Sequence, residues 1–578
     1  MNLKFYRRAA LGMGLVLMLL CYFASVRRMQ PTNFFGLTQD DTIYFSSAQA
    51  LAAGHGYILP SVPGKPHATK YPILYPGILS WVWRWNPSFP SNLSDAAMVS
   101  AAFGACFLVL VFFFLRSLKG IGEMEALILT AFCALHPLFI FYGGSLLSDL
   151  PFAALAFAAM LVADFAMRRD ARMFWPVVCA ALAGLSMLTR VLGVPVAVGI
   201  AVAGMSRRSW RQVFAFCACV APFLLFAGWR AVFPHLPEMP VAGPAASSFG
   251  WTRTWVYYTS YLGAWKQGVP DWAAFMAMVE NNANFILRGP SDIFLSPGLM
   301  PDNALGHALV AIVTVSALVG IIRQAKMQEW KPIAFVLPLY VMVILFWNFQ
   351  DANNRYFLPF WPLFAAGLWV EARHALALAR RVLQSRASLA EAMVAVVLGA
   401  AILSLGGAIL WNYIYGSRSL AREKSRERGE LLVSKQAAYK WLAHNTAPGT
   451  RVIAYEDVSL YLYTGREALS PMAAVIAELY EPARLEESLS HMTDLPRAIG
   501  AEYWVFSDDD FSNSSDEIVP QASLRMRELE SVLPAVYQSA DGRVRIRALG
   551  CVLHPEEATC QQADRVLFPE AGERAANQ

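Results

Sequence analysis

Charged residues are scarce in this sequence. Of its 578 residues only 15% are charged, whereas 56% are hydrophobic, and an ordinary soluble domain carries about 25% charged residues. The shortage excludes a soluble globular protein and predicts a polytopic membrane protein. The formal net charge of +5 is small, and nothing in the sequence suggests a nucleic-acid partner.

Cysteines in a metal-binding pattern are also absent. Six of the eight cysteines lie in apolar runs, where a cysteine is most simply a small buried hydrophobe: Cys21, Cys106, Cys133, Cys179, Cys217 and Cys219. Cys551 and Cys560 alone fall in a polar region, and their spacing matches no metal site. They would be able to form a disulfide if that region lies outside the cytoplasm.

Apolar runs divided by basic loops predict about eleven transmembrane helices. The first run is followed by Arg27 and Arg28 without a small-residue cleavage site, so we interpret it as a retained helix rather than a signal peptide. Each run is about long enough for a ~30 Å hydrocarbon core. The predicted crossings are 9–26, 96–115, 126–142, 151–167, 174–205 as two short helices broken at Thr189-Arg190, 213–233, 304–322, 333–347, 357–370 and 392–411.

The basic loops set the predicted orientation. Lys and Arg accumulate in cytoplasmic loops, so the N-terminus is expected in the cytoplasm and the C-terminal region outside it. The long loops 29–94 and 234–301 then lie on the outer face. Within the first loop, an amphipathic helix ending at Gly54 and an interfacial helix carrying Trp81, Trp83 and Trp85 are expected.

The chain becomes soluble in composition after residue 412. Residues 422–428 form a charged linker or helix, and the patterns of 436–444 and 482–491 are helical. Strands are expected at 451–455 and 503–506, and a hairpin over 536–549 turns at Asp541-Gly542. Strands alternating with helices predict a small α/β domain, so we divide the chain into a membrane domain, 1–412, and an extracytoplasmic domain, 413–578.

Two adjacent carboxylates, Asp40 and Asp41, follow the first apolar run by only a few residues. Ionised groups beside hydrocarbon are costly and often functional. One interpretation is that a carboxylate serves as a base or charge anchor in a site that opens at the membrane surface. The other is a solvated loop that carries charge without a function.

Three more charged positions share the predicted outer face with this pair. Lys70 suits contact with a phosphate, although a lysine that snorkels at the interface is the structural alternative. Asp149 precedes Pro151 and can cap the next helix. Arg355, in the polar group 351–355, offers a second phosphate contact or an interface anchor.

Together these residues predict a site with carboxylates for an acceptor and cations for a phosphorylated lipid. A carboxylate can take the proton of an attacking hydroxyl or amine, and cations stabilise the charge that grows on a phosphate leaving group. Asp40 and Asp149 are also candidate ligands of a divalent metal cation. The aromatic loop 255–261 either lines a sugar or lipid groove or forms an interfacial belt.

The order of these motifs resembles the GT-C membrane glycosyltransferases, in particular the bacterial group related to protein O-mannosyltransferases and the lipid A aminoarabinose transferase. The matching stretches are Asp40-Asp41-Thr42-Ile43-Tyr44, Lys70-Tyr71-Pro72-Ile73, Ser148-Asp149-Leu150-Pro151, Arg355-Tyr356-Phe357-Leu358-Pro359 and, in the C-terminal part, Leu460-Tyr461-Leu462-Tyr463-Thr464-Gly465-Arg466. Tyr71 stands where a proline is usual, and Asp41 where relatives often have Glu, so the roles of Asp40 and Asp41 are open to exchange.

The resemblance implies inverting transfer of a sugar from a polyprenyl-phosphate donor to a lipid, glycan or protein acceptor of the envelope, at the outer face of the bacterial cytoplasmic membrane. The implied catalytic residues are Asp40, Asp41 and Asp149. The implied substrate-binding residues are Lys70, Tyr71, Tyr44, Arg355 and Tyr356. The resemblance implies no cofactor with certainty. If a divalent metal cation binds, Asp40 and Asp149 are its expected ligands.

Two other classes of function compete with this interpretation. A lipid or solute transporter would carry charges at broken helices near the bilayer midplane, within a repeated architecture, but the sequence shows no internal repeat. A non-catalytic envelope scaffold would use the C-terminal domain for binding, and it leaves the charges of the outer loops without an explanation.

Overall fold

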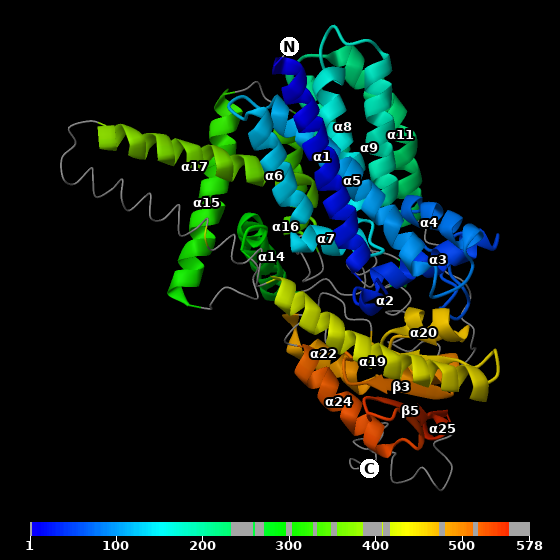
Figure 1. The fold of residues 1–578 in the computed structure, drawn as a ribbon. Coiled ribbons are helices and arrows are strands. Elements are labelled where there is room, and N and C mark those ends of the chain that lie inside the picture. The colour runs from blue at the N-terminus through cyan, green and yellow to red at the C-terminus, as the bar shows by residue number, and fades with distance from the viewer. Residues whose placement is uncertain are drawn as a thin grey trace.

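The computed structural model describes residues 3–29, 31–232, 258–259, 271–295, 303–327, 332–347, 355–384, 407, 417–472, 480–511 and 518–553. A bundle of helices carries the N-terminus at one end, and a smaller unit with a β-sheet packs against the other (Figure 1). We call this second end of the bundle the far end.

Long apolar helices form the bundle. Among the described residues, five helices are long and apolar enough to cross a membrane: α1 (Leu3–Arg28), α5 (Leu93–Ser117), α8 (Asp149–Ala166), α11 (Trp210–Val232) and α15 (Ala304–Met327). A sixth crossing results if α6 (Glu123–Leu135) and α7 (Pro137–Gly144), which meet at a bend of 58°, count as one broken span. The bend falls where Pro137 begins a new helix, because proline cannot continue the hydrogen bonding of the preceding helix.

Other predicted crossings differ from simple spans. The expected break in 174–205 is confirmed, since α9 (Phe174–Thr189) and α10 (Gly193–Ser206) are separate helices of 16 and 14 residues. Each is shorter than the ~20 residues that a crossing requires, and so is α16 (Ile333–Leu345). The prediction of about eleven spans is therefore supported only in part, and the predicted crossing 392–411 lies outside the described residues.

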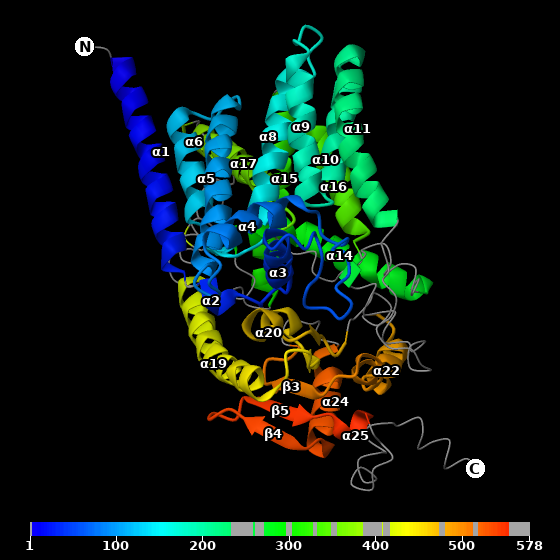
Figure 2. The ribbon, with the colours of Figure 1, turned by 90° about the vertical axis from the view of Figure 1, so that its right-hand side faces the viewer.

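The predicted crossing 357–370 takes a different form. It begins with the short 3-10 helix η3 (Leu358–Phe360) and continues into α17 (Trp361–Gln384), which extends well beyond residue 370. Figures 1 and 2 show α17 running across α15 rather than along the bundle. Gly320 of α15 and Gly367 of α17 lie so close at this crossing that a Cβ on Gly320 would overlap the Gly367 carbonyl.

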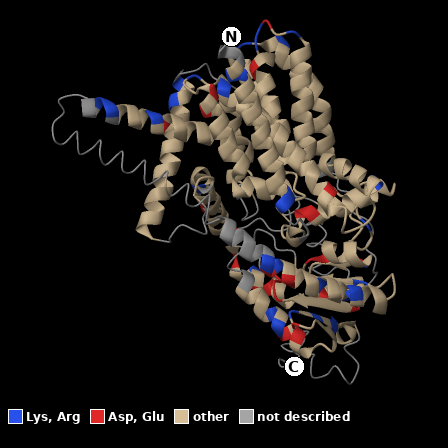
Figure 3. Ribbon diagram, in the orientation of Figure 1, with Lys and Arg blue, Asp and Glu red and all other residues tan. Residues whose placement is uncertain are grey.

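Basic loops gather at the end of the bundle that carries the N-terminus. Glu123 pairs there with Arg7 at 3.1 Å and Arg116 at 2.8 Å, and Arg373 pairs with Glu125 at 3.0 Å. Figure 3 shows charged residues at the two ends of the bundle and very few between them. This pattern agrees with the loop alternation expected from the sequence.

Three short helices and one longer helix cover the far end: α2 (Pro31–Phe34), α3 (Asp40–Ala52), α4 (Leu74–Trp85) and the longer α14 (Trp272–Asp292). The expected helix before Gly54 is confirmed, but it begins earlier, so Asp40 and Asp41 lie in its first turn rather than in a loop. In α4, Trp81 and Trp85 are exposed while Trp83 is buried, as expected of an interfacial helix. The loop predicted over 234–301 contains the 21-residue helix α14.

The C-terminal unit is an α/β structure with a five-stranded mixed sheet. The strand order is β2 (Ala468–Leu469), β1 (Val452–Ala454), β3 (Tyr503–Ser507), β5 (Val544–Ala548) and β4 (Ala535–Gln538). β1 is parallel to β2 and β3, whereas β5 is antiparallel to β3 and β4. Both predicted strands and the hairpin are confirmed, and Gly542 takes the positive φ of 73° that its turn needs.

Helices pack around this sheet: α19 (Ser417–Asn445), α20 (Asp457–Thr464), α22 (Pro482–Ser490), α23 (Asp494–Ile499), α24 (Ile518–Val532) and α25 (Gly550–Leu553). The charged stretch 422–428 and the predicted helix 436–444 are parts of the single helix α19. Cys551 is disulfide-bonded, and Cys560 lies outside the described residues.

The C-terminal unit packs directly against the far end of the bundle. Helix α20 lies between α3 and the sheet (Figure 2). One apolar cluster contains Tyr44 and Trp83 from the far end together with Ile453 and Trp504 from the sheet. Because this cluster crosses between the two parts, the sheet lies close to the outer loops. The predicted boundary after residue 412 stays a prediction, since residues 408–416 are not described.

Candidate active site

The first turn of α3 places Asp40 in a polar network at the far end. Arg355 donates from Nη2 to Asp40 Oδ2 at 2.6 Å, and the Tyr71 hydroxyl donates to Oδ1 at 2.7 Å. Burial alone would raise the pKa of this carboxyl, but the Arg355 charge and the Tyr71 hydrogen bond outweigh it and hold the pKa below its usual value. Asp40 is therefore ionised at neutral pH.

Asp41 points away from this network and has a different environment. Its carboxylate accepts hydrogen bonds from the backbone N–H of Gly36 and of Thr42, both at 2.9 Å, and from the Thr38 hydroxyl at 3.3 Å. Burial raises its pKa to about 7. Asp41 thus ties the chain before α3 to the start of the helix, and the structure separates the two carboxylates that the sequence left interchangeable.

Asp149 is the first residue of α8, with Ser148 as the N-cap. Its Oδ1 accepts a hydrogen bond from Arg190 and lies 3.8 Å from Arg355 Nε. Its Oδ2 is buried without a hydrogen-bond partner among the described residues. The carboxylate is thus turned to two guanidinium groups, which goes beyond the capping role that its position before Pro151 suggested.

Arg190 is the site residue that sequence reasoning missed. It lies in the break between α9 and α10, and its side chain is only 11% exposed. The sequence pattern predicts only a break between two short helices at Thr189-Arg190. The available signal was a cation in the middle of an apolar run, because charges at such positions usually face a partner inside the bundle.

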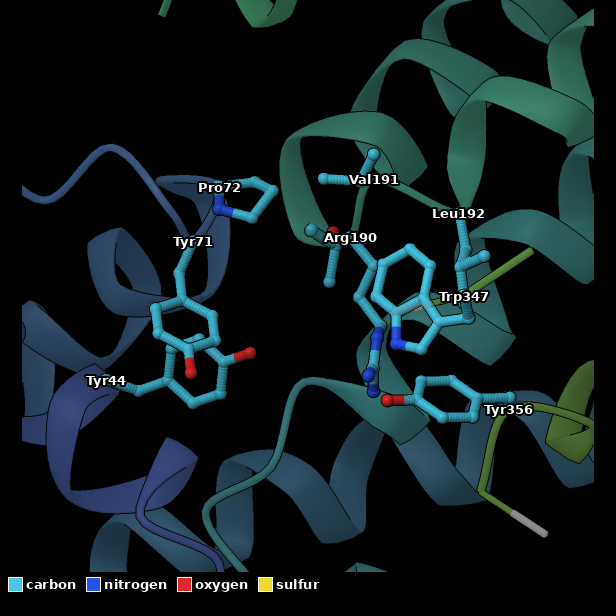
Figure 4. A pocket seen from close by; sticks show the side chains of 9 residues that line it. Tyr44, Tyr71, Pro72, Arg190, Val191, Leu192, Trp347 and Tyr356 are labelled. Carbon is cyan, nitrogen blue, oxygen red and sulfur yellow. The ribbon is translucent and has the colours of Figure 1, made fainter. Parts of the chain in front are cut away.

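A pocket opens beside these charged groups, with about 280 Å³ of empty space that includes open solvent. Nine residues from five parts of the chain line it: Tyr44, Tyr71, Pro72, Thr189, Arg190, Val191, Leu192, Trp347 and Tyr356. Figure 4 shows Tyr44 and Tyr71 facing Arg190, Trp347 and Tyr356 across the pocket. Its walls therefore combine aromatic rings, aliphatic groups and one guanidinium.

Tyrosine side chains hold the walls of the pocket in place. The Tyr44 hydroxyl lies 2.9 Å from the Ser148 hydroxyl, which joins α3 to the start of α8. The guanidinium carbons of Arg190 and Arg355 lie 5.2 and 5.4 Å from the centroid of the Tyr356 ring. Stacking on an aromatic face restrains an arginine without removing its charge.

Lys70 precedes Tyr71 and is buried. Its Nζ lies 5.5 Å from the centroid of the Tyr71 ring. Burial lowers its pKa to about 8, and the nearby charge of Asp40 partly opposes the change. A snorkelling lysine keeps its amine in water, so this burial contradicts the interfacial alternative and leaves Lys70 as a cation next to the site.

The carboxylates do not fit a divalent cation in this arrangement. Asp40 and Asp149 are each bonded to a guanidinium, and these positive groups would repel a metal ion placed between them. Among the described residues, no three His, Cys, Asp or Glu side chains gather where they could hold a metal. We therefore derive no chemical step through a metal ion.

The structure brings together most of the residues that the sequence singled out. Asp40, Asp149 and Arg355 form the charged centre, Lys70 lies beside it, and three tyrosines line the pocket. Of the aromatic loop, only residues 258 and 259 are described, and residues 351–354 lie outside the described part. The arrangement offers an ionised base and several cations next to a pocket with apolar walls.

Comparison with known proteins gives structural matches only. No family model and no curated protein matches the sequence. The chain is similar to ArnT from Cupriavidus metallidurans in the apo state, with 13% identity, a TM-score of 0.47, and 94% of this chain and 98% of that chain covered. It is also similar to the same protein bound to undecaprenyl phosphate, with 14% identity, a TM-score of 0.45, and 93% and 98% covered.

A third solved structure is an archaeal oligosaccharyltransferase, AglB from Archaeoglobus fulgidus, in complex with an inhibitory peptide and a dolichol-phosphate. It matches with 14% identity and a TM-score of 0.48, and 93% of this chain and 74% of that chain are covered. The identities of 13 to 14% and the TM-scores below 0.5 carry no argument about the superfamily. The resemblance to the GT-C glycosyltransferases that the short motifs indicate therefore stays a prediction.

Proposed function

We propose that the protein is a membrane glycosyltransferase that moves a sugar from a polyprenyl-phosphate donor to an acceptor of the cell envelope, at the outer face of the bacterial cytoplasmic membrane. The observation that carries the proposal is the position of Arg355. It joins Asp40 to Asp149 beside a pocket that Arg190, three tyrosines and apolar side chains line. A base, several cations and apolar side chains close together are the groups that sugar transfer from a lipid-linked phosphate needs.

The donor phosphate would bind to the cations. Guanidinium groups bind phosphate oxygens through paired hydrogen bonds, and Arg190 faces the pocket directly (Figure 4). Lys70 adds a positive charge below pH 8. Pro72, Leu192 and Trp347 form an apolar wall on which the first carbons of the lipid chain would lie. The phosphate would also compete with Asp40 for Arg355 and so free the carboxylate.

Asp40 would then act as the base in a single displacement. The acceptor oxygen or nitrogen attacks the anomeric carbon while its proton passes to Asp40. The bond between that carbon and the phosphate oxygen breaks, and the polyprenyl phosphate leaves with the bonding electrons. The configuration of the anomeric carbon inverts because the attack and the departure occur on opposite sides. The cations stabilise the negative charge that grows on the leaving phosphate.

Mass spectrometry of a deletion strain tests this proposal. Polyprenyl-phosphate sugars and envelope glycans would be compared between cells with and without the protein. We expect one sugar-modified envelope component to disappear in the deletion strain, with its lipid-linked donor retained or increased. Unchanged donor and envelope profiles would refute the proposed transfer.

Variants of the carboxylates make the test specific to the site. Asp40→Asn keeps the size of the side chain but cannot accept the proton, so it should abolish the product while the protein still inserts and folds. Asp95→Asn is the matched control, because Asp95 is exposed and bonded to Asn86 at 2.9 Å. Normal product with Asp40→Asn would remove Asp40 as the base.

A transporter remains the second candidate because of one observation. Arg190 lies at a break between two short helices, which is where transporters bind their substrates. However, the carboxylate, tyrosine and lysine of the site come from α3 and the segment before α4 at the far end of the bundle. Flux of a lipid or solute without a new covalent product in the deletion comparison would favour transport.

A further inference from the structure

One short segment of the C-terminal unit, residues 455–470, contacts both parts of the far end that carry site residues. We call it the clamp segment. It runs from the end of β1 through α20 to the residue after β2, and Figure 2 shows α20 between α3 and the sheet. The contacts reach across hundreds of residues, so they exist only in the folded chain.

The first contact fixes the start of α3. Gln39, the residue before Asp40, has a φ of 56°, a left-handed conformation that is uncommon for residues other than glycine. Its side-chain Nε2 donates to the carbonyl oxygen of Tyr455 at 3.2 Å. The Gln39 carbonyl in turn accepts from the Thr42 hydroxyl at 2.8 Å. An unfavourable backbone conformation persists only when its surroundings hold it, and here the clamp segment supplies one of the contacts.

The second set of contacts holds the loop that carries Lys70. The Tyr258 hydroxyl donates to the buried carboxylate of Asp457, and the carbonyl of the next residue, Thr259, accepts a hydrogen bond from Thr69. In the same loop, the carbonyl of Ser61 accepts from the backbone N–H of Ala468 at 2.9 Å. The clamp segment therefore holds the chain before Lys70 at two points, directly at Ser61 and through Tyr258 and Thr259 at Thr69.

A buried cluster of ion pairs joins the clamp segment to α19 and to the residues after β3. Lys435 of α19 pairs with Glu456 at 2.9 Å and with Asp509 at 2.8 Å. Arg428 pairs with Glu456 at 3.3 Å and donates to the carbonyl of Asn33 at 3.3 Å, just before α3. The cluster joins α19, the clamp segment and the α2 region, so the clamp segment is held rigidly to the rest of its unit.

From these contacts we propose that the C-terminal unit is part of the active-site architecture: its clamp segment sets the position of Asp40 relative to Lys70, and Gln39 and Asp457 are positioning residues. The proposal rests on the proposed glycosyl transfer and adds a function for the C-terminal unit. It separates two effects. Gln39 sets the position of the base, Asp40, and hence the rate of turnover. Asp457 sets the position of the loop that carries Lys70 and hence the affinity for the donor.

Two measurements on the full-length protein test the separation. The first is the rate at which the product missing from the deletion strain forms in cells that express each variant. The second is the affinity of the purified protein for undecaprenyl phosphate, used as the probe. Displacement of a reacting group by about 1 Å costs about a hundredfold in rate, so effects of at least about tenfold are expected.

The variants are matched to the two contacts. Gln39→Met keeps the side-chain length but cannot donate to Tyr455; it should lower the product rate at least about tenfold and leave the affinity for undecaprenyl phosphate within about twofold. Asp457→Ala should weaken that affinity about tenfold, and Asp457→Asn, which retains an acceptor oxygen for Tyr258, should restore it. Ser434→Ala, which removes an exposed bond to Asp541 in the same unit, should change neither quantity.

A further variant keeps the test decisive if Gln39→Met does not fold. Gln39→Gly relieves the left-handed backbone but also removes the contact to Tyr455, so it should fold at least as well as the wild type and still lose product. Wild-type product rate in Gln39→Gly, or wild-type affinity in Asp457→Ala, would overturn the positioning role while leaving the proposed transfer intact. A wild-type protein that neither binds the probe nor makes a product would instead refute the proposed transfer.

Discussion

Replacing Asp149 by asparagine removes the charge on which two buried guanidinium groups depend. The Asp149 side chain is 1% exposed and that of its partner Arg190 is 11% exposed. Arg355, which lies 3.8 Å from the same carboxylate oxygen, is 13% exposed. After the substitution, Asp40 is the one carboxylate bonded to a guanidinium at this centre, and the two cations repel each other across a poorly solvated space.

The expected cost follows from the burial of the pair. Removal of one partner of a buried ion pair costs about 3 to 5 kcal/mol, because the other charge remains buried without compensation. We expect Asp149→Asn and Arg190→Gln each to lower the free energy of unfolding by about 3 kcal/mol. The double variant holds a neutral amide pair instead, so its loss should be smaller than the sum by about 2 kcal/mol.

Equilibrium unfolding of the four proteins by SDS titration in mixed micelles measures this coupling. The double-mutant cycle isolates the interaction of the two side chains from their separate effects on insertion and packing. Additive losses, with a coupling energy near zero, would refute the inference that Asp149 and Arg190 form a buried pair. The three variants should also make no product, because Arg190 is either replaced or has lost the carboxylate that orients it in the pocket.

Two further predictions concern the ligand. Burial lowers the pKa of Lys70 to about 8, so its amine is protonated below that pH and neutral above it. The affinity for undecaprenyl phosphate should therefore fall as the pH rises through about 8. Lys70→Arg should remove this pH dependence, and an unchanged profile in that variant would exclude Lys70 as the titrating group. Asn282 of α14 is fully buried and donates to the carbonyls of Leu345 and Trp347. Asn282→Ala should lower the free energy of unfolding by about 2 kcal/mol. It should also weaken the binding of undecaprenyl phosphate, because Trp347 lines the pocket.

Much of the fold was predictable because apolar periodicity and charge placement report local physics. An apolar run beside basic residues indicates a helix in lipid, and α1, α5, α8, α11 and α15 follow that rule. The hairpin at Asp541-Gly542 and the short strands are equally local. The interfacial face of α4 was visible in the spacing of its tryptophans. The helix within 234–301 was missed, since three asparagines and Pro290 interrupt the apolar residues of α14.

The candidate site was only partly predictable. Asp40, Lys70, Asp149 and Arg355 were found because charges are rare in this chain and those that remain near lipid draw attention. Arg190 was passed over because a charge at the break between two short helices had a sufficient local explanation. Which of the paired carboxylates bonds to Arg355 could not be predicted, because it depends on contacts between distant residues. The residue before the pair, Gln39, bonds to a carbonyl 416 positions away.

By itself, then, the sequence determined that the chain belongs in a membrane, where most of its helices lie, and which rare charges share the far end of the bundle. These properties depend on side chains close together along the chain. Only the tertiary structure decided that Arg190 meets Asp149, that Asp40 and Asp41 take different partners, and that the C-terminal unit contacts Gln39 and the loop before Lys70. Such contacts form between distant residues, and their geometry comes from packing, which no local pattern records.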